Sequence, residues 1–461
     1  MKRDTEQMYA TMNPWRLFFV VALPGMVSMF AMSIYFIIEG IFIGQKLGEA
    51  ALAAINIATP LVMINFSIAD LIGVGASVPI SISLGKKDHD AANNIFTSSI
   101  ILIFTASVAM GLIMTLAAEP LCRMMGADAE LLDTSVRYLR TFAVSGPFCT
   151  IFFAMDNFLR ISGYVKTSMV INICTNVINV ALLVVALVLL QMDVVGSALA
   201  SSIAMGLASL ACLMPFLRGK ALLKFTKPRI SFKMIKEIVA CGSPAFLNNI
   251  AGRVAAIMMN VALMTLGVKA YGEGGGTTAV AVYAVLMYSS DLCWPLLYGI
   301  SDSLAPSIGY NWGADNHDRV KKIVKCAYIG TAVIGFVSTA MLFLFPRFIA
   351  SWFVSAEDTL LLSESARAIR IFCFAYVFRW FGVTTQGFFS AIEKPLFATL
   401  MSVSTALVFP VILLVALWPL GLDGIWANFI GVTLLTALLG GALLIRVARE
   451  IKAKSENNIK V

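Results

Sequence analysis

Long apolar stretches separated by short polar segments dominate the chain. Twelve of them reach about 20 residues, the length that a helix needs to cross the hydrocarbon layer of a membrane. They are continuous and do not alternate between apolar and polar positions, so they predict helices and not the strands of a membrane barrel. The predicted spans are 15–43, 51–83, 93–117, 136–158, 167–190, 194–217, 238–266, 278–311, 322–345, 367–391, 396–419 and 424–446. The pattern predicts an all-α polytopic membrane protein with twelve transmembrane helices.

Composition agrees with this prediction. Of the 461 residues, 59% are hydrophobic and only 13% are charged, whereas a soluble domain carries about 25% charged residues. A soluble multidomain enzyme would not cover its surface with so few polar groups. The high apolar content also excludes a disordered chain.

Basic residues are distributed unequally between the two sides of the predicted membrane helices. Loops that share a side with the termini hold 24 of the 34 Lys and Arg residues, and the opposite loops hold eight. Because cytoplasmic loops are enriched in Lys and Arg, both termini are expected to be cytoplasmic. The connector 218–237 holds seven of these residues and is mainly a charged linker, with contact to anionic membrane lipids as a further possibility. No basic domain with interleaved aromatic residues is visible, so nucleic acid is not an expected partner.

An internal repeat divides the chain into two halves. Gly85–Asp90 matches Gly313–Asp318 at an offset of 228 residues, and the same offset aligns Ala51–Ala54 with Ala279–Val282. Six predicted spans separate the matched segments, so both halves have the same orientation in the membrane, and substrate sites of such parallel repeats lie between the halves. The expected domains are a six-helix bundle at 1–217, a cytoplasmic connector at 218–237, a second six-helix bundle at 238–447 and a cytoplasmic tail at 448–461.

Short motifs in both halves resemble the multidrug and toxic compound extrusion (MATE) family of cation-coupled antiporters. They are Pro24, Glu39–Gly44, Leu47–Ala54, Gly73–Ser77 with Pro79, Leu84–Asp88, Leu159–Gly163, Pro306, Tyr310–Ala314 and Arg319–Val320. The resemblance covers most of the chain. It implies a secondary transporter in a prokaryotic inner or plasma membrane that exports amphipathic or cationic drugs or metabolites in exchange for H⁺ or Na⁺. Pro24, Pro60 and Pro79 are candidate kink points in the first two spans.

Glu39 is the leading candidate for a coupling-ion site. It lies inside the first predicted span, where a charged group is costly and usually faces a cavity or a partner. Tyr35 lies one helical turn earlier, on the same helix face. A carboxyl group there can load a proton on one side of the membrane and release it on the other, or its oxygens can hold Na⁺. The alternative is a structural carboxyl group that bonds two helices. The resemblance implies that the acidic position is a coupling-ion group and that Tyr35 is a cavity tyrosine.

Polar residues of the fourth to sixth spans can join Glu39, namely Asn157, Asn176, Asn179, Ser201 and Ser202. The resemblance places Asn157, Asn179 and Ser202 where prokaryotic MATE proteins line a cation site, although such side chains also serve as bonds between helices. That pattern carries an Asp one turn after the Asn of the fifth span, and this chain has Leu183. Asp70 or Asp156 is therefore a candidate for the second carboxylate.

Asp156 has a simpler alternative role. Arg160 lies one turn further along the same predicted helix, so the two side chains can neutralise each other. Asp70 does not match an acidic position of the family pattern and is a candidate cavity residue.

The second half differs from the first. The position equivalent to Glu39 has no acidic residue, and Arg379 lies near a position where some MATE members carry an Asp. Arg253, Asp291 and Arg379 are candidates for the substrate cavity, and Asp291 or Asp302 can pair with the two arginines. Ion coupling is therefore assigned to the first half.

The motifs of other functional classes are missing from the sequence. His89 and His317 lie in the repeated loops, the eight Cys residues have no zinc-type spacing, and no Walker A motif occurs. We expect no enzymatic activity, no metal, no cofactor besides the coupling ion and no obligate protein partner. The alternatives are a flippase for lipid-linked precursors, which would need a strongly basic cavity, and a membrane binding protein that does not transport.

Overall fold

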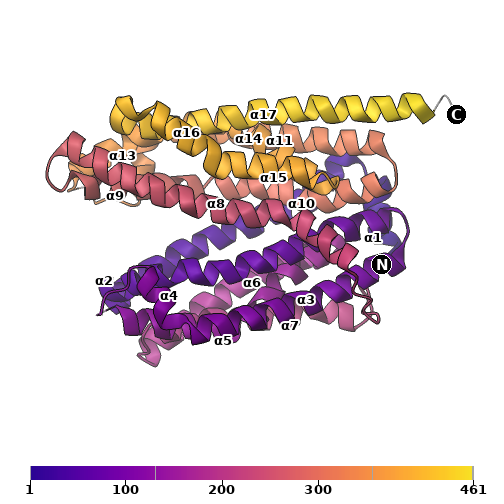
Figure 1. Ribbon diagram of the computed structural model, residues 1–461, viewed down its shortest axis with the longest axis horizontal. Coiled ribbons are helices and arrows are strands. Elements are labelled where there is room, and N and C mark those ends of the chain that lie inside the picture. Colours follow the sequence, from indigo (N-terminus) through magenta and orange to yellow (C-terminus); the bar gives the residue numbers. More distant parts are fainter. Residues whose placement is uncertain (1, 130, 356, 459–461) are drawn as a thin grey trace. The chain divides into compact units, whose positions relative to one another are not determined.

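The computed structural model describes residues 2–129, 131–355 and 357–458, and these form helices without a β-strand (Figure 1). The α-helices are α1 Lys2–Thr11, α2 Pro14–Gly85, α3 His89–Leu116, α4 Ala118–Met124, α5 Leu132–Ile161, α6 Val165–Val184, α7 Val194–Leu217, α8 Phe232–Tyr271, α9 Gly275–Asp291, α10 Trp294–Gly313, α11 His317–Leu344, α12 Pro346–Ala350, α13 Thr359–Phe372, α14 Tyr376–Ala391, α15 Pro395–Val403, α16 Phe409–Ala416 and α17 Gly421–Asn458. Short π or 3₁₀ segments are η1 Val185–Leu189, η2 Cys373–Ala375, η3 Ser404–Val408 and η4 Trp418–Leu420.

The apolar helices confirm the predicted fold class. In the described residues, ten helical segments are long and apolar enough to cross a membrane, and the bent pair α9–α10 adds one more. The remaining predicted span, 367–391, falls on α13, η2 and α14, where a 3₁₀ turn divides the segment into two shorter helices. All twelve predicted spans thus coincide with helical segments of an all-α polytopic membrane protein.

Polar caps at the chain turns explain where several helices begin. The Asn13 side chain accepts a hydrogen bond from the Trp15 backbone N–H at 3.0 Å, and Pro14 occupies the first turn of α2. The Asp88 carboxylate accepts from the Ala91 N–H at 2.9 Å at the start of α3. Such caps satisfy backbone donors that have no partner inside the helix.

Helix α2 contains the first two membrane spans, Pro14–Gly48 and Ala53–Gly85. Gly48 is the residue of α2 whose backbone angles are not helical, with φ 84° and ψ 177°. A residue with a Cβ rarely adopts a positive φ, so glycine allows the chain to turn there. Helical backbone angles continue through Pro24, Pro60 and Pro79.

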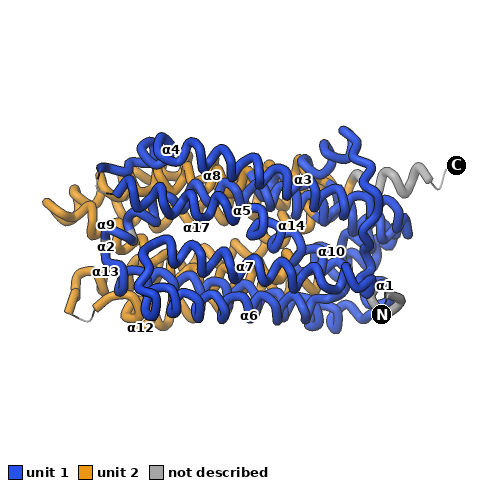
Figure 2. Tube along the Cα trace, turned by 90° about the horizontal axis from the view of Figure 1, so that it is seen from below, with its two compact units in different colours: residues 1–246, 303–323, 391–393 blue, residues 247–302, 324–390, 394–461 orange. Residues whose placement is uncertain are grey.

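The chain forms two compact units (Figure 2). Unit 1 consists of residues 1–246, 303–323 and 391–393, and unit 2 of residues 247–302, 324–390 and 394–461. An apolar core in unit 1 joins α2, α5, α6 and α7 and includes Leu61, Leu139 and Leu183. A second core in unit 2 joins α8, α9, α13 and α17. Each unit therefore has its own buried helix packing.

Two glycines of the sequence repeat allow close helix contact inside unit 1. A Cβ added to Gly85 would overlap the carbonyl oxygen of Tyr310, and a Cβ added to Gly313 would overlap that of Ile82. Gly85 and Gly313 are 228 residues apart, as are Ile82 and Tyr310, so the two contacts are equivalent under the repeat. Small residues at this crossing let the two backbones approach closely.

Candidate functional site

Glu39 lies in a small polar cluster built from three helices of unit 1. The Ser201 hydroxyl on α7 lies 3.3 Å from Glu39 Oε1 and 3.3 Å from Asn179 Oδ1 on α6. The Tyr35 hydroxyl, one turn before Glu39 on α2, lies 3.2 Å from Ser201 Oγ. Tyr35, Asn179 and Ser201 are buried, whereas Glu39 is partly exposed. The structure therefore brings three predicted site residues, Tyr35, Glu39 and Asn179, together around Ser201.

The partners of Glu39 suit more than one charge state. Hydroxyl groups donate to an ionised carboxylate and accept from a protonated carboxyl group, so Tyr35 and Ser201 tolerate both forms. In the part of the chain that the structure describes, no Lys or Arg lies within ion-pairing distance of Glu39. The four side chains also gather four oxygen-bearing groups, the type of ligand that hard cations prefer. The cluster is thus chemically compatible with a proton or a small hard cation at this carboxylate.

The structure distinguishes two serines that the sequence offers together, and it adds a tyrosine near the site. Ser201, and not its neighbour Ser202, contacts Glu39 and Asn179; Ser202 lies on another side of α7, where its hydroxyl is 2.6 Å from Ser145 Oγ. Tyr138 on α5 also interacts electrostatically with Glu39 and was missed. A lone tyrosine in an apolar span gives no signal in a single sequence that separates it from core residues.

Asp156 belongs to a separate, buried cluster. Its carboxylate pairs with Arg160 at 2.8 Å, as the spacing predicts, and accepts hydrogen bonds from Ser168 at 2.5 Å and Asn172 at 2.8 Å. Asp156 is 9% exposed and Arg160 6%. Asn172 and Asn179 lie seven residues apart on α6, which is roughly 10 Å along a helix at 1.5 Å per residue. The hydrogen bonds from Ser168 and Asn172 to Asp156 tie α5 to α6, about two turns of α6 away from Asn179 in the Glu39 cluster.

The other first-half candidates do not contact Glu39. The Asn157 side chain lies in the Asp156 cluster, where its Oδ1 accepts from Arg160 at 3.0 Å. Asp70 is half-buried on the second span of α2. Leu183, which occupies the position of the expected Asp, is fully buried in the apolar core of unit 1.

Arg379 of α14 is held by aromatic rings and hydroxyl groups inside unit 2. Its guanidinium carbon lies 5.0 Å from the ring centroid of Trp294 and 5.3 Å from that of Tyr376, distances typical of cation–π contacts. Its Nη1 also lies 3.4 Å from Ser290 Oγ and from the Tyr376 hydroxyl oxygen. Asp291 is exposed and interacts with Arg379 electrostatically, but no ion pair within 4 Å joins them.

Arg253 is exposed on α8. Throughout the described residues, no group of three or more His, Cys, Asp or Glu side chains is arranged to hold a metal ion.

A model of the MatE family matches residues 24–185 and 250–415, one segment in each half of the repeat. Among curated proteins, the chain is 25% identical to the multidrug export protein MepA of Staphylococcus saprophyticus over 434 residues, which is 93% of each chain. It is 25% identical to MepA of Staphylococcus aureus over 460 residues, covering 97% of both chains.

Solved structures share the fold over nearly the whole chain. A MATE protein in a straight conformation superposes with a TM-score of 0.90 at 23% identity, covering 97% of this chain and 99% of that one. An outward-facing multidrug resistance MATE family transporter of the MOP superfamily superposes with a TM-score of 0.88 at 22% identity, covering 97% and 98%.

Proposed function

Because this chain belongs to the MatE family of membrane transporters, we propose that it exports small amphipathic or cationic compounds in exchange for H⁺ or Na⁺. Members of this family are transporters and not enzymes. The arrangement around Glu39 carries the proposal: among the described residues the carboxyl group has no basic partner, it lies beside the hydroxyl groups of Ser201 on α7 and Tyr35 on its own helix, and it is partly exposed. Such a carboxyl group can bind H⁺ or Na⁺ on one side of the membrane and release it on the other, and this needs no cofactor.

The substrate class rests on the relatives. The MepA proteins that align over more than nine-tenths of this chain are named multidrug export proteins. The 23 Met and 31 Phe residues supply adaptable apolar surface, which suits compounds of varied shape. Small molecules of this kind are therefore the proposed substrates.

Orientation and location are part of the proposal. The 24-to-8 bias of Lys and Arg supports cytoplasmic termini in the plasma membrane of a prokaryote. We also propose that residues 1–217 and 238–447 act as the two six-helix bundles of the transport cycle. Binding of the ion at Glu39 would favour one packing of the first-half helices over another, and this difference would drive release of the substrate.

Transport by purified protein in liposomes tests this proposal. Vesicles loaded at low pH are diluted into medium of higher pH, and vesicles loaded with Na⁺ are diluted into medium without Na⁺, so that each dilution creates an outward ion gradient. Uptake of the cationic dye ethidium is followed by fluorescence. We expect the outward gradient of one of the two ions to drive dye accumulation and a collapse of the gradient to abolish it. Dye uptake that depends on neither gradient would overturn ion coupling.

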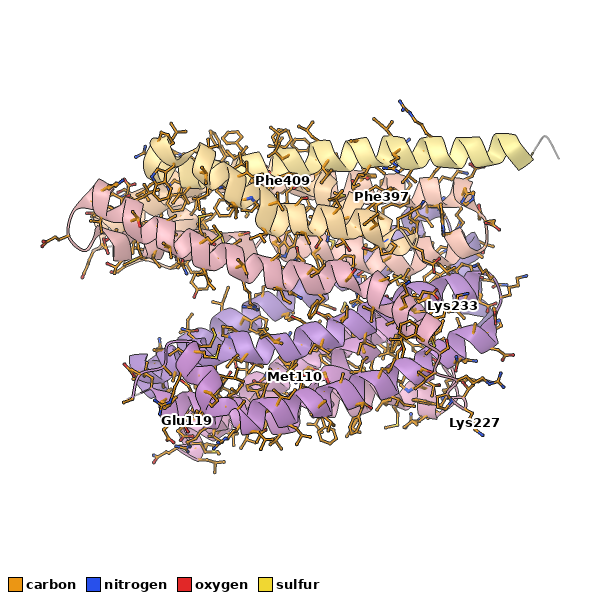
Figure 3. All side chains as sticks on the ribbon, in the orientation of Figure 1. Met110, Glu119, Lys227, Lys233, Phe397 and Phe409 are labelled. Atoms are coloured by element: carbon orange, nitrogen blue, oxygen red, sulfur yellow. The ribbon has the colours of Figure 1, made fainter. Side chains whose placement is uncertain are left out.

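The connector between the halves is the proposed contact with anionic lipids. The side chains of Asn93, Asn94 and Thr97 on α3 hold its backbone: Asn93 Oδ1 accepts from Lys224 N at 2.8 Å, Thr97 Oγ1 from Thr226 N at 3.0 Å, and Asn94 Oδ1 from Arg229 N at 2.7 Å. The four basic side chains between Lys224 and Lys233 and three large apolar side chains beside them are exposed (Figure 3 labels Lys227 and Lys233). They are Lys224, Phe225, Lys227, Arg229, Ile230, Phe232 and Lys233. Exposed cations beside apolar groups suit the headgroup region of a negatively charged leaflet.

Replacing Lys224, Lys227 and Arg229 together by Gln is expected to weaken retention of phosphatidylglycerol. Each basic residue near an anionic surface contributes about 1 kcal/mol, so native mass spectrometry should find markedly less lipid bound to the variant. The matched control replaces Lys321, Lys322 and Lys325 by Gln, which removes the same charge from another loop on the same predicted side. An equal loss of lipid in both variants would contradict a specific contact at the connector.

A further inference from the structure

Helix α1 precedes the first membrane span and lies outside the sequence repeat. It is bound to two helices of the first half: the buried Tyr9 hydroxyl donates to the carbonyl oxygen of Arg160, at the end of α5, at 2.5 Å. Glu6 Oε1 lies 3.5 Å from His89 Nε2 at the start of α3. One side of α1 is therefore attached to the ends of α3 and α5.

The end of the same helix is bound to the second half of the sequence, within unit 1. The carbonyl oxygen of Tyr9 accepts from Asn311 Nδ2 at 3.0 Å and from Arg319 Nε at 2.8 Å, and that of Met12 accepts from Arg319 Nη2 at 2.6 Å. These carbonyl groups lie at the C-terminal end of α1, where helix carbonyls lack intrahelical partners and a positive charge is favoured. Arg319 thus caps α1 and joins it to α11, and Asn311 joins it to α10.

Beneath these contacts lies the close crossing of the two repeat helices. Gly85 at the end of α2 and Gly313 at the end of α10 pack directly on each other's helix, and α1 binds Asn311 in the same turn. Cys241 on α8 is buried nearby in a small apolar cluster with Val78 and Ile82, against which Trp312 packs. The contacts of α1 and this crossing therefore involve the same ends of the two halves.

We propose that α1 is a latch that holds these ends of the two halves together and must release before the transporter opens toward the cytoplasm. The proposal rests on the proposed function, since a parallel-repeat transporter admits substrate by separating its halves on one side of the membrane. A contact present in the closed arrangement and absent from the open one shifts the balance between them by its own free energy. Tyr9 and Arg319 are the two principal contacts of this latch.

The latch is not duplicated by the sequence repeat. At the 228-residue offset, Asn311 corresponds to Ser83 and Arg319 to Ala91, and neither Ser nor Ala can provide the amide or guanidinium donors that bind α1. The repeat supplies the symmetric glycine crossing, and α1 adds an asymmetric contact to it. In this proposal, release of α1 is a step of cytoplasmic opening that is distinct from separation of the two helices at the glycine crossing.

The reactivity of Cys241 measures this opening directly. Inside-out membrane vesicles are treated with a membrane-impermeant maleimide, and modification of each cysteine is quantified by peptide mass spectrometry. Cys241 is 5% exposed and is protected while the crossing is closed, and fully buried Cys149 on α5 reports general unfolding. Arg319→Ala removes the two charged hydrogen bonds to α1, and Tyr9→Phe removes the hydroxyl group and keeps the ring.

We expect Cys241 to be labelled at least about ten-fold faster in Arg319→Ala and about five-fold faster in Tyr9→Phe, since hydrogen bonds from charged donors are stronger than neutral ones. Cys149 should stay protected in both. The matched control is Arg123→Ala, which removes an arginine from an exposed pair with Glu119 on α4.

Unchanged labelling of Cys241 in Arg319→Ala would overturn the latch, and so would an equal increase in the control or at Cys149. The measurement needs no substrate and no ion gradient. If the liposome experiment shows no ion-coupled export, the labelling result for Cys241 still stands. If the labelling of Cys241 does not change, the latch is excluded and the evidence for export is unaffected.

Discussion

Replacing Glu39 by Gln is expected to abolish ion-driven export while the protein still folds and inserts. Glutamine preserves the length of the side chain and can bond to the hydroxyl of Ser201, which lies 3.3 Å from Glu39 Oε1. It cannot exchange a proton and carries no charge to attract a cation. Coupling between two ligands typically changes affinity by about 5–150-fold. The rate of ethidium uptake driven by an ion gradient should therefore fall by a factor of about 5–150 or more, to the level of empty liposomes.

Three comparisons make this expectation specific. Glu119→Gln, at an exposed glutamate paired with Arg123 on α4, makes the same chemical change in the same unit and should transport normally. Glu39→Asp retains an acid and should keep part of the coupling. Ethidium exchange without a gradient should persist in Glu39→Gln, because exchange needs substrate binding but no ion. Coupled uptake at the wild-type rate in Glu39→Gln would exclude Glu39 as the coupling group.

The membrane fold was predictable because the hydrophobic pattern is strong and long-range. Each span is long enough for its length alone to separate it from a loop, and the gap between the spans 15–43 and 51–83 contains the turn at Gly48. Irregular segments were not predictable. The π segments Val185–Leu189 and Ser404–Val408 and the 3₁₀ turn Cys373–Ala375 interrupt sequences as apolar as their surroundings. Their hydrogen-bond pattern depends on packing against other helices and not on local residue type.

The site was predictable only in part, for geometric reasons. Tyr35 and Glu39 share a face of one helix, which their spacing of four residues dictates. Ser201 and Ser202 differ by one position, which rotates a side chain by about 100° around a helix of 3.6 residues per turn. Which serine meets Glu39 depends on how α7 is rotated against α2, and one sequence does not encode that rotation visibly.

The separation of Asp156 from Glu39 bears on the missing second carboxylate of the family pattern. Asp156 is bound by Arg160, Ser168 and Asn172, so all its strong partners are already in place without an added ion. Glu39 lies beside hydroxyl groups, and no Lys or Arg of the described residues is within ion-pairing distance of it. Asp156 therefore bonds α5 to α6, and Glu39 stays the proposed ion-binding carboxyl group.

Replacing Asp156 by Ala is accordingly expected to cause the largest loss of stability in unit 1. Removing one partner of a buried ion pair leaves the other charge uncompensated and typically costs about 3–5 kcal/mol. Arg160, at 6% exposure, would be left without its carboxylate. The melting temperature of the purified protein in detergent should fall steeply, whereas Asp133→Ala, at an exposed carboxylate on the same helix, should change it little.

A double variant separates stability from ion coupling. Asp156→Leu with Arg160→Met replaces the pair by apolar side chains, a change that is often neutral for buried pairs, and the backbone carbonyl group of Arg160 that binds Tyr9 is kept. We expect it to recover most of the lost melting temperature and to retain export driven by the ion gradient. A double variant that folds but no longer couples would show that Asp156 supplies the second carboxylate after all. A double variant that couples would leave Glu39 as the coupling carboxylate of the first half.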